Sequence, residues 1–364
     1  MQDENPILEL KDIRKSFLSK QVLNGISIKL FRGKITCMLG PSGCGKTTAL
    51  KIISGIERQD SGTVVFENKV ISDKNYGDSA SDYRNIGLVF QDFALFPHLT
   101  VFDNVAYGLK GKLRNDLIFQ RVSELLKKVN LENYDQKYPH MLSGGEQQRI
   151  ALIRAIAPKP PVMLMDEPFS GLDDRLRDEI RDYTLYLLKD EKAAVLIVTH
   201  DPDEAMKMAD NIALMRDGEI VQHGAPYNIY NSPSDIRVAK FFSQINIIDG
   251  VVQNSQVNTA FGPFFTPGLI NGTAVSIVIR PQHLKLDFDR NGKGPEPSVS
   301  DGIAARGLVL SSRFVGKESI VELEIDKFAL KLVVTIPGVF LPSKGVALWA
   351  SMRRDRCFVF PKEK

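Results

Sequence analysis

The eight residues Gly40–Thr47 (GPSGCGKT) limit the fold of this chain more than any other stretch of the sequence. They match the pattern of a glycine, four residues and then Gly-Lys-Ser/Thr, and they follow the apolar segment Lys34–Leu39. Apolar residues then recur at helical spacing, so a helix is expected to begin near Lys46. A loop of this pattern between a buried strand and a helix predicts a phosphate-binding backbone at the edge of a parallel sheet.

The same loop supplies charge and a hydroxyl. Lys46 would interact with the β- and γ-phosphates of a nucleotide, and the Thr47 hydroxyl would complete the coordination of Mg²⁺. The alternative is a plain glycine-rich turn. Cys44 is interpreted as a small filler rather than a nucleophile, because no Cys–His pair lies nearby in the sequence. The predicted nucleotide-binding residues of this segment are Gly40, Pro41, Ser42, Gly43, Cys44, Gly45, Lys46, Thr47 and Thr48.

Two further apolar segments, Val162–Met165 and Ala194–Thr199, have the length of strands buried on both faces. Between them, Asp173–Lys189 carries apolar residues at helical spacing. This strand–helix–strand unit predicts an α/β core with parallel strands.

Polar residues follow both of these predicted strands. Asp166 and Glu167 come directly after the first, and His200 follows the second. Ligands of open parallel sheets lie at the carboxyl ends of the strands, so these side chains are expected at one edge. Asp166 would then reach the Mg²⁺ shell, Glu167 would orient or deprotonate the attacking water, and His200 would lie near the γ-phosphate. The alternatives are a solvated acidic loop and a histidine that caps a helix.

The stretch Leu142–Arg149 (LSGGEQQR) narrows the class of nucleotide hydrolase. It resembles the signature motif Leu-Ser-Gly-Gly-Gln of the ABC ATPase family, and the family's pattern covers Ile7–Ala239 in order. The resemblance implies that Phe17 stacks on adenine and that Gln91 contacts Mg²⁺ and the attacking water. It also places Asp173 in a loop that crosses to a partner subunit, and it makes His200 the switch histidine. The residues implied to contact ATP from the signature are Ser143, Gly144 and Gly145.

Glu146 departs from the family's usual glutamine. Ser-Gly-Gly directly before a predicted helix, Glu146–Ala157, forms a second anion-binding helix start. One nucleotide does not need two such elements. In the ABC ATPase family two subunits associate head to tail, and the signature motif of one closes on the ATP held by the loop of the other. The resemblance therefore implies an ATP-dependent homodimer with two composite sites.

The chain is expected to contain two domains. Residues 1–240 would form the P-loop ABC ATPase domain with its helical subdomain. Residues 241–364 would be a small all-β domain, because Ser319–Ile325 alternates and several other short runs are strand-like. This region resembles the OB-like regulatory (TOBE) domain of importer ATPases, and Val275–Leu284 is similar to its Arg-Pro strand. The other strands are expected at Val275–Ile279, Gly307–Ser311, Phe328–Val334, Val346–Ala350 and Cys357–Phe360.

Composition limits the partners. The net charge of +3 over 364 residues is small for a nucleic-acid binder, so no nucleic-acid partner is expected. No apolar run approaches the roughly 18–20 residues that span a bilayer, no signal peptide is visible, and three scattered cysteines fit a reducing compartment. The resemblance therefore implies a peripheral protein at the cytoplasmic face of the inner membrane. It would bind a permease, with Phe93–Leu109 as the receiving surface, and act indirectly with a substrate-binding protein.

The cargo is predicted only from resemblance. The segment Pro168–Tyr183 is most similar to ferric-iron importer ATPases, while polyamine, thiamine, phosphonate and sugar importers share nearly all the motifs. Two other classes remain as alternatives. One is a soluble ABC ATPase that acts on nucleic acid or ribosomes, and the other is a ligand-binding regulator with a vestigial ATPase.

Overall fold

The structure, a computed structural model, describes residues 5–73, 85–90, 92–170, 174–289, 292–298, 300–326 and 328–362. The chain divides into two compact units, Met1–Asn231 and Ser232–Lys364. This division assigns helix α8 (Ile236–Phe242) to the second unit. The predicted boundary between residues 240 and 241 stays a prediction.

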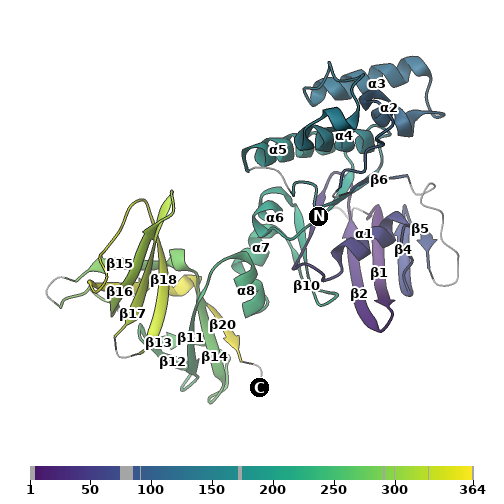
Figure 1. Cartoon of the computed structure of the whole chain (residues 1–364). Helices are drawn as coiled ribbons and strands as arrows, with labels where there is room; N and C mark the ends of the chain where they lie inside the picture. The colour runs from purple at the N-terminus through teal and green to yellow at the C-terminus, as the bar shows by residue number, and fades with distance from the viewer. Residues whose placement is uncertain are drawn as a thin grey trace. The chain divides into compact units, whose positions relative to one another are not determined.

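A six-stranded sheet forms the centre of the first unit (Figure 1). Its order is β10-β9-β3-β8-β7-β6, and all neighbouring pairs are parallel except β9 with β10. Strands β3, β7 and β8 are buried along their whole length, as expected for unbroken apolar segments. The strands are β3 (Ile35–Leu39), β6 (Ile86–Val89), β7 (Val162–Asp166), β8 (Ala194–Thr199), β9 (Asn211–Arg216) and β10 (Glu219–Gly224). The predicted α/β fold is confirmed.

A second sheet of the same unit is antiparallel, with the order β2-β1-β4-β5. This sheet was not predicted from the sequence. Its core residues belong to the same hydrophobic cluster as those of β7 and β8, so the two sheets and α1 share one core. The strands are β1 (Leu8–Phe17), β2 (Lys20–Leu30), β4 (Ser61–Phe66) and β5 (Lys69–Ser72).

Some helices of the first unit pack on the parallel sheet, and others form a group of their own. Figure 1 shows α2, α3 and α4 gathered on one side of the first unit, away from α1. These three helices contact one another, and α4 also contacts α5, so they form the predicted helical subdomain. The helices are α1 (Lys46–Ser54), α2 (Val101–Ala106), α3 (Asn115–Lys128), α4 (Gly144–Ile156), α5 (Asp174–Asp190), α6 (Pro202–Met208) and α7 (Pro226–Asn231). None of the helices in the described ranges combines the length and apolarity that a membrane crossing requires.

The segment that follows Gln91, part of the surface predicted to receive a permease, is partly buried. Phe93 and Phe96 are half-buried, whereas Val105 lies in the core. Arg154 of α4 donates hydrogen bonds to the carbonyl oxygens of Phe93 (3.0 Å) and Ala94 (2.7 Å), which both have positive φ angles. Helix α4, which begins at the signature motif and is called the signature helix, therefore holds this segment in place.

After α8, the second unit is built from strands, which confirms an all-β region. A three-stranded sheet (β11-β14-β20), a hairpin (β12-β13) and a five-stranded sheet (β15-β19-β16-β17-β18) share one apolar core. In the predicted strand Ser319–Ile325, the side chains of Val321, Leu323 and Ile325 are buried as the alternation requires. The strands are β11 (Asn246–Val251), β12 (Gln256–Thr259), β13 (Gly262–Phe265), β14 (Ala274–Ile279), β15 (Leu284–Phe288), β16 (Ala305–Phe314), β17 (Glu318–Ile325), β18 (Leu330–Pro337), β19 (Ala347–Met352) and β20 (Phe358–Pro361).

Candidate functional site

The glycine-rich loop joins the end of β3 to the start of α1, as predicted. Gly40 has a φ of +159°, and a Cβ there would lie 2.3 Å from the carbonyl oxygen of Met215. Gly45 has a φ of +107°, and a Cβ there would lie 2.6 Å from Leu23. Both positions need glycine because a side chain has no room. Among the described residues no side chain caps α1 at Gly45, which leaves the N–H groups of its first turn available to bind an anion.

Lys46 organises the loop from inside. It is 5% exposed, and its Nζ donates to the carbonyl oxygens of Gly40 (2.8 Å) and Pro41 (2.9 Å). Cys44 is also buried, with its Sγ 3.9 Å from the same ammonium. Burial raises the pKa of the Cys44 thiol despite this cation, which disfavours the reactive thiolate.

Two oxygen ligands meet at the edge of the sheet. The Thr47 hydroxyl donates to Asp166 Oδ1 at 3.3 Å. Asp166 is 8% exposed, and burial is the main cause that raises the pKa of its carboxyl, with the charge of Glu167 contributing further. A hydroxyl and a carboxylate are hard oxygen donors, so the pair fits Mg²⁺, which would also relieve the cost of burying the carboxylate.

Glu167 has an unusual backbone. Its φ of +46° lies in the left-handed region, where a residue other than glycine costs about 1–3 kcal/mol. Its N–H donates to the carbonyl oxygen of Val198 in β8 (2.9 Å), and the Ser170 hydroxyl donates to its carbonyl oxygen (2.9 Å). These contacts hold the strained turn, so the direction of the carboxylate is set by the sheet and not by the loop alone.

His200 follows β8 and reaches Glu167. Its Nδ1 lies 2.9 Å from Glu167 Oε1, and its side chain is 54% exposed. Strands β3, β8 and β7 are neighbours in parallel, with Leu39 paired with Thr199 and Asp166 paired with Val198. The expectation that the loop, the acids and the histidine share one sheet edge is therefore confirmed.

A cavity of about 190 Å³ joins the loop to the acid. Its lining is Val22, Ser42, Gly43, Gly45, Lys46, Thr47, Thr48 and Glu167. Phe17 ends β1 in the hairpin that also contains Val22, and its ring is 43% exposed, with Lys15 Nζ 5.0 Å from the ring centre. Gln91 and Asp173 lie outside the described residues.

The signature motif starts helix α4, as predicted. Ser143 is the N-cap: its hydroxyl accepts from the Glu146 N–H (3.4 Å), and Glu146 Oε2 accepts from the Ser143 N–H (2.7 Å). This reciprocal pair is a capping box. Accepting that backbone bond is the main cause that lowers the pKa of the Glu146 carboxyl. The side chain at position 146 therefore has a structural role at the helix start. The lining of the loop cavity does not include Ser143, Gly144 or Gly145.

The capping box makes a testable prediction. Ser143→Ala removes the N-cap acceptor and should lower the free energy of unfolding of the first unit by about 0.5–2 kcal/mol. Glu146→Gln keeps an acceptor oxygen for the Ser143 N–H, so its effect should be smaller. Chemical denaturation of both variants measures this difference. An equal or larger loss in Glu146→Gln would show that the charge, and not the hydrogen bond, stabilises the helix start.

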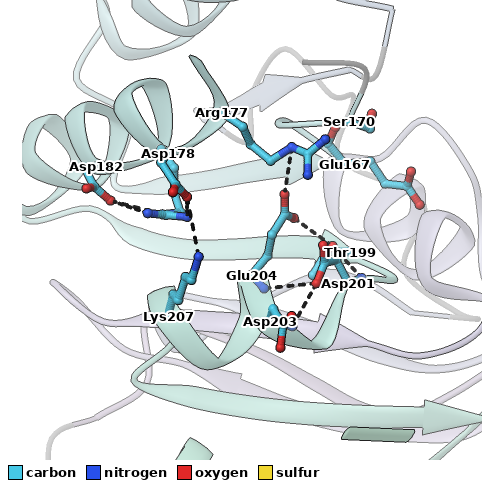
Figure 2. Close-up of polar contacts among 11 residues, drawn as sticks. Glu167, Ser170, Arg177, Asp178, Asp182, Thr199, Asp201, Asp203, Glu204 and Lys207 are labelled. Carbon is cyan, nitrogen blue, oxygen red and sulfur yellow. Dashed lines mark hydrogen bonds and ion pairs between the residues drawn. The ribbon is translucent and has the colours of Figure 1, made fainter. Parts of the chain in front are cut away.

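Sequence reasoning missed a group of residues beside this site. A second cavity, of about 250 Å³, is lined by Glu167, Ser170, Arg177, Thr199, His200, Asp201 and Glu204. Figure 2 shows Glu204 between Arg177 of α5 and Thr199 at the end of β8. These residues are widely separated in the sequence. The one signal for Glu204 is its place three residues after the N-cap Asp201, the spacing typical of a capping box.

Comparisons with known proteins identify the family of the chain. A family model described as "ABC transporter" matches residues 23–170. The chain is 35% identical to the spermidine/putrescine import ATP-binding protein of Photobacterium profundum, over 88% of this chain and 86% of the relative. It is also 35% identical to the Fe(3+) ions import ATP-binding protein of Haemophilus influenzae, over 90% of this chain and 91% of the relative.

A solved structure extends the comparison to the fold. It is a dimeric, post-hydrolysis state of an ATP-binding cassette bound to ADP and Pi, which matches with a TM-score of 0.54 and 30% identity. The match covers 60% of this chain and 98% of that chain. The family match, together with relatives that are similar over most of their length, leads to one conclusion: the chain is an ATPase of the ABC transporter family.

Proposed function

We propose that this chain is the ATP-hydrolysing subunit of an importer, and that it works as a homodimer bound to a membrane permease. The observation that carries the proposal is the common edge of β3, β8 and β7, where Lys46, Asp166, Glu167 and His200 meet. Relatives that match most of the chain are named as import proteins, which supports the transport role.

The proposed chemistry is hydrolysis of the γ-phosphoryl group. Lys46 and the N–H groups of the loop bind the β- and γ-phosphates, and Phe17 stacks on the adenine. Glu167 orients a water molecule and accepts its proton while the water oxygen bonds to the γ-phosphorus. The bond from that phosphorus to the β,γ-bridging oxygen then breaks, which leaves ADP and inorganic phosphate. His200, hydrogen-bonded to Glu167 Oε1, holds the carboxylate in direction and lies near the γ-phosphate.

Mg²⁺ would be held by Thr47 and Asp166, whose oxygens already lie 3.3 Å apart, together with Gln91. When bound, the ion neutralises charge on the β- and γ-phosphates.

The signature helix supports the dimer. The start of α4 offers N–H groups for an anion, and its residues do not line the cavity of their own subunit's loop. In the proposed arrangement, Ser143, Gly144 and Gly145 contact the γ-phosphate of ATP held by the partner subunit, and Asp173 lies at the same interface. The dimeric cassette with ADP and Pi supports this arrangement. Closure of the dimer on ATP would drive the permease, and hydrolysis would reset it.

The permease would contact the segment after Gln91. The rings of Phe96 and Tyr107 pack with their centres 4.6 Å apart, and Tyr107 is 55% exposed, so aromatic surface is available to a partner helix. The second unit would act as an OB-like regulatory (TOBE) domain. Permease binding would place the chain at the cytoplasmic face of the inner membrane, with a substrate-binding protein acting indirectly.

The proposed cargo is ferric iron, on the resemblance of Pro168–Tyr183 to ferric-iron importer ATPases and the Fe(3+) import relative. A polyamine is the second candidate, because two relatives named for spermidine/putrescine import are 35% and 39% identical to this chain, against 35% for the Fe(3+) import relative.

Uptake by intact cells tests the proposal. Deleting the gene should abolish ATP-dependent uptake of labelled Fe³⁺ and leave spermidine uptake unchanged, and the reverse result would select the polyamine. A plasmid with the wild-type gene should restore uptake, whereas a Lys46→Ala copy should not. Normal uptake of both cargoes, together with a tagged chain that co-purifies with RNA or ribosomes instead of integral membrane proteins, would overturn the import proposal.

A further inference from the structure

A buried carboxylate connects two segments that flank the proposed catalytic residues. Glu204, in the first turn of α6, is 8% exposed, and burial is the main cause that raises the pKa of its carboxyl. Its Oε2 accepts from the Thr199 hydroxyl at 3.1 Å, and its Oε1 lies 3.9 Å from Arg177 Nε in α5 (Figure 2). One side chain therefore links the end of β8 to the helix that follows the Glu167 turn.

Thr199 connects Glu204 to the backbone next to His200 through hydrogen bonds of its hydroxyl. The same hydroxyl that donates to Glu204 accepts from the Asp201 N–H at 3.0 Å. Thr199 is 2% exposed, so water does not replace either bond easily. The peptide that follows His200 is thus fixed through Thr199, and the imidazole meets Glu167 Oε1 at 2.9 Å.

Stability alone does not explain this arrangement. A buried ion pair at a long distance recovers little of the cost of removing two charges from water, and an apolar pair of similar volume is often equally stable. A carboxylate that accepts a hydrogen bond from a buried hydroxyl and faces a guanidinium on its other side does, however, set the direction of that hydroxyl. The residues beside it, Ser170 and Glu167, line the same cavity of about 250 Å³.

We propose that Glu204 and Arg177 are positioning residues for ATP hydrolysis, which hold His200 against Glu167 through the Thr199 hydroxyl. The inference rests on the proposed roles of Glu167 and His200. Neither Glu204 nor Arg177 lines the loop cavity proposed for the nucleotide. Loss of the link should therefore lower kcat and leave the KM for ATP nearly unchanged.

The test uses ATP hydrolysis by the purified full-length chain. Glu204→Leu, which removes both acceptor oxygens, should lower kcat roughly 10- to 100-fold, as expected when a reacting group is misplaced, with KM within about twofold of wild type. Thr199→Val should lower kcat similarly, and Thr199→Ser, which keeps the hydroxyl, should restore it. The double variant Glu204→Leu with Thr199→Val should be no slower than either single variant, since both substitutions break the same link.

Lys207→Gln provides the matched control. Lys207 lies on the same helix, is exposed and pairs with Asp178 at 3.5 Å, so its loss should leave kcat unchanged. Thermal unfolding of every variant, with Thr199→Ser as the conservative reference, separates misfolding from misplacement.

The outcomes separate the two proposals. A Glu204→Leu enzyme with wild-type kcat, or losses that multiply in the double variant, would overturn the positioning link. If His200→Ala hydrolyses ATP at the wild-type rate, the proposed role of His200 fails instead. A large loss of kcat in His200→Ala, together with kcat losses for the Glu204 and Thr199 substitutions that multiply in the double variant, would reject only the link. The proposed function would then stand.

Discussion

Replacing Glu167 by glutamine is expected to lower kcat for ATP hydrolysis by roughly 10²- to 10⁴-fold, the range that a positioned general base contributes. Glutamine fits the same left-handed turn, since the Val198 and Ser170 contacts involve only the backbone of residue 167. It has no carboxylate to accept a proton from the attacking water. ATP binding should therefore persist while the chemical step stops.

The same variant should reveal the dimer. With hydrolysis blocked, the closed ATP-bound state accumulates, so Glu167→Gln should shift from monomer to dimer when ATP and Mg²⁺ are added. Sedimentation velocity with and without nucleotide measures this, and phosphate release measures turnover. Glu132→Gln, an equal loss of charge at an exposed position, is the control. A Glu167→Gln chain that stays monomeric with ATP and turns over normally would show that the base is elsewhere.

Replacing Lys46 by alanine should act on binding instead. Lys46 is buried, and its ammonium both holds two loop carbonyls and supplies the charge proposed for the phosphates. A hydrogen bond to a charged group is worth about 1.5–3 kcal/mol, so the affinity for ATP should fall roughly 10- to 100-fold.

Equilibrium titration with a fluorescent ATP analogue measures this loss of affinity directly. Lys51→Ala removes an exposed lysine from the same helix and should bind ATP nearly as wild type does. Unchanged affinity in Lys46→Ala would contradict the assignment of the loop as the phosphate site. The Glu167 and Lys46 variants together thus separate the step of binding from the step of hydrolysis.

The parallel core could be predicted because its strands are uniformly apolar. β3, β7 and β8 are buried on both faces, so each appears in the sequence as an unbroken run of apolar residues. Such a run can be recognised without any alternation of polar and apolar positions. The antiparallel sheet could not be predicted in the same way. In β1 the pairing with β2 shifts between Leu10 and Ile13, and such bulges interrupt the period of two that marks a half-buried strand. In the second unit, β12 and β13 have only four residues each, too few for a periodic signal.

Some residues of the candidate site could likewise be predicted from the sequence, and others could not. Lys46, Asp166, Glu167 and His200 were predictable because each directly follows a buried strand or a recognisable loop, and parallel strands place such positions together. The contact between Arg177 and Glu204 was not predictable. It depends on how α5 and α6 pack, and residues on two different helices leave no periodic trace of their contact in the sequence.

The place of β3 in its sheet bears on the order in which this protein can be assembled during synthesis. Its two neighbours are β8, paired from Val195 to Thr199, and β9, paired from Asn211 to Leu214. A nascent chain that has not yet emerged beyond these residues leaves both edges of β3 open, although the glycine-rich loop was made long before. The ribosome therefore releases the nucleotide loop early, but its supporting strand gains its neighbours only after more than half of the chain has been translated.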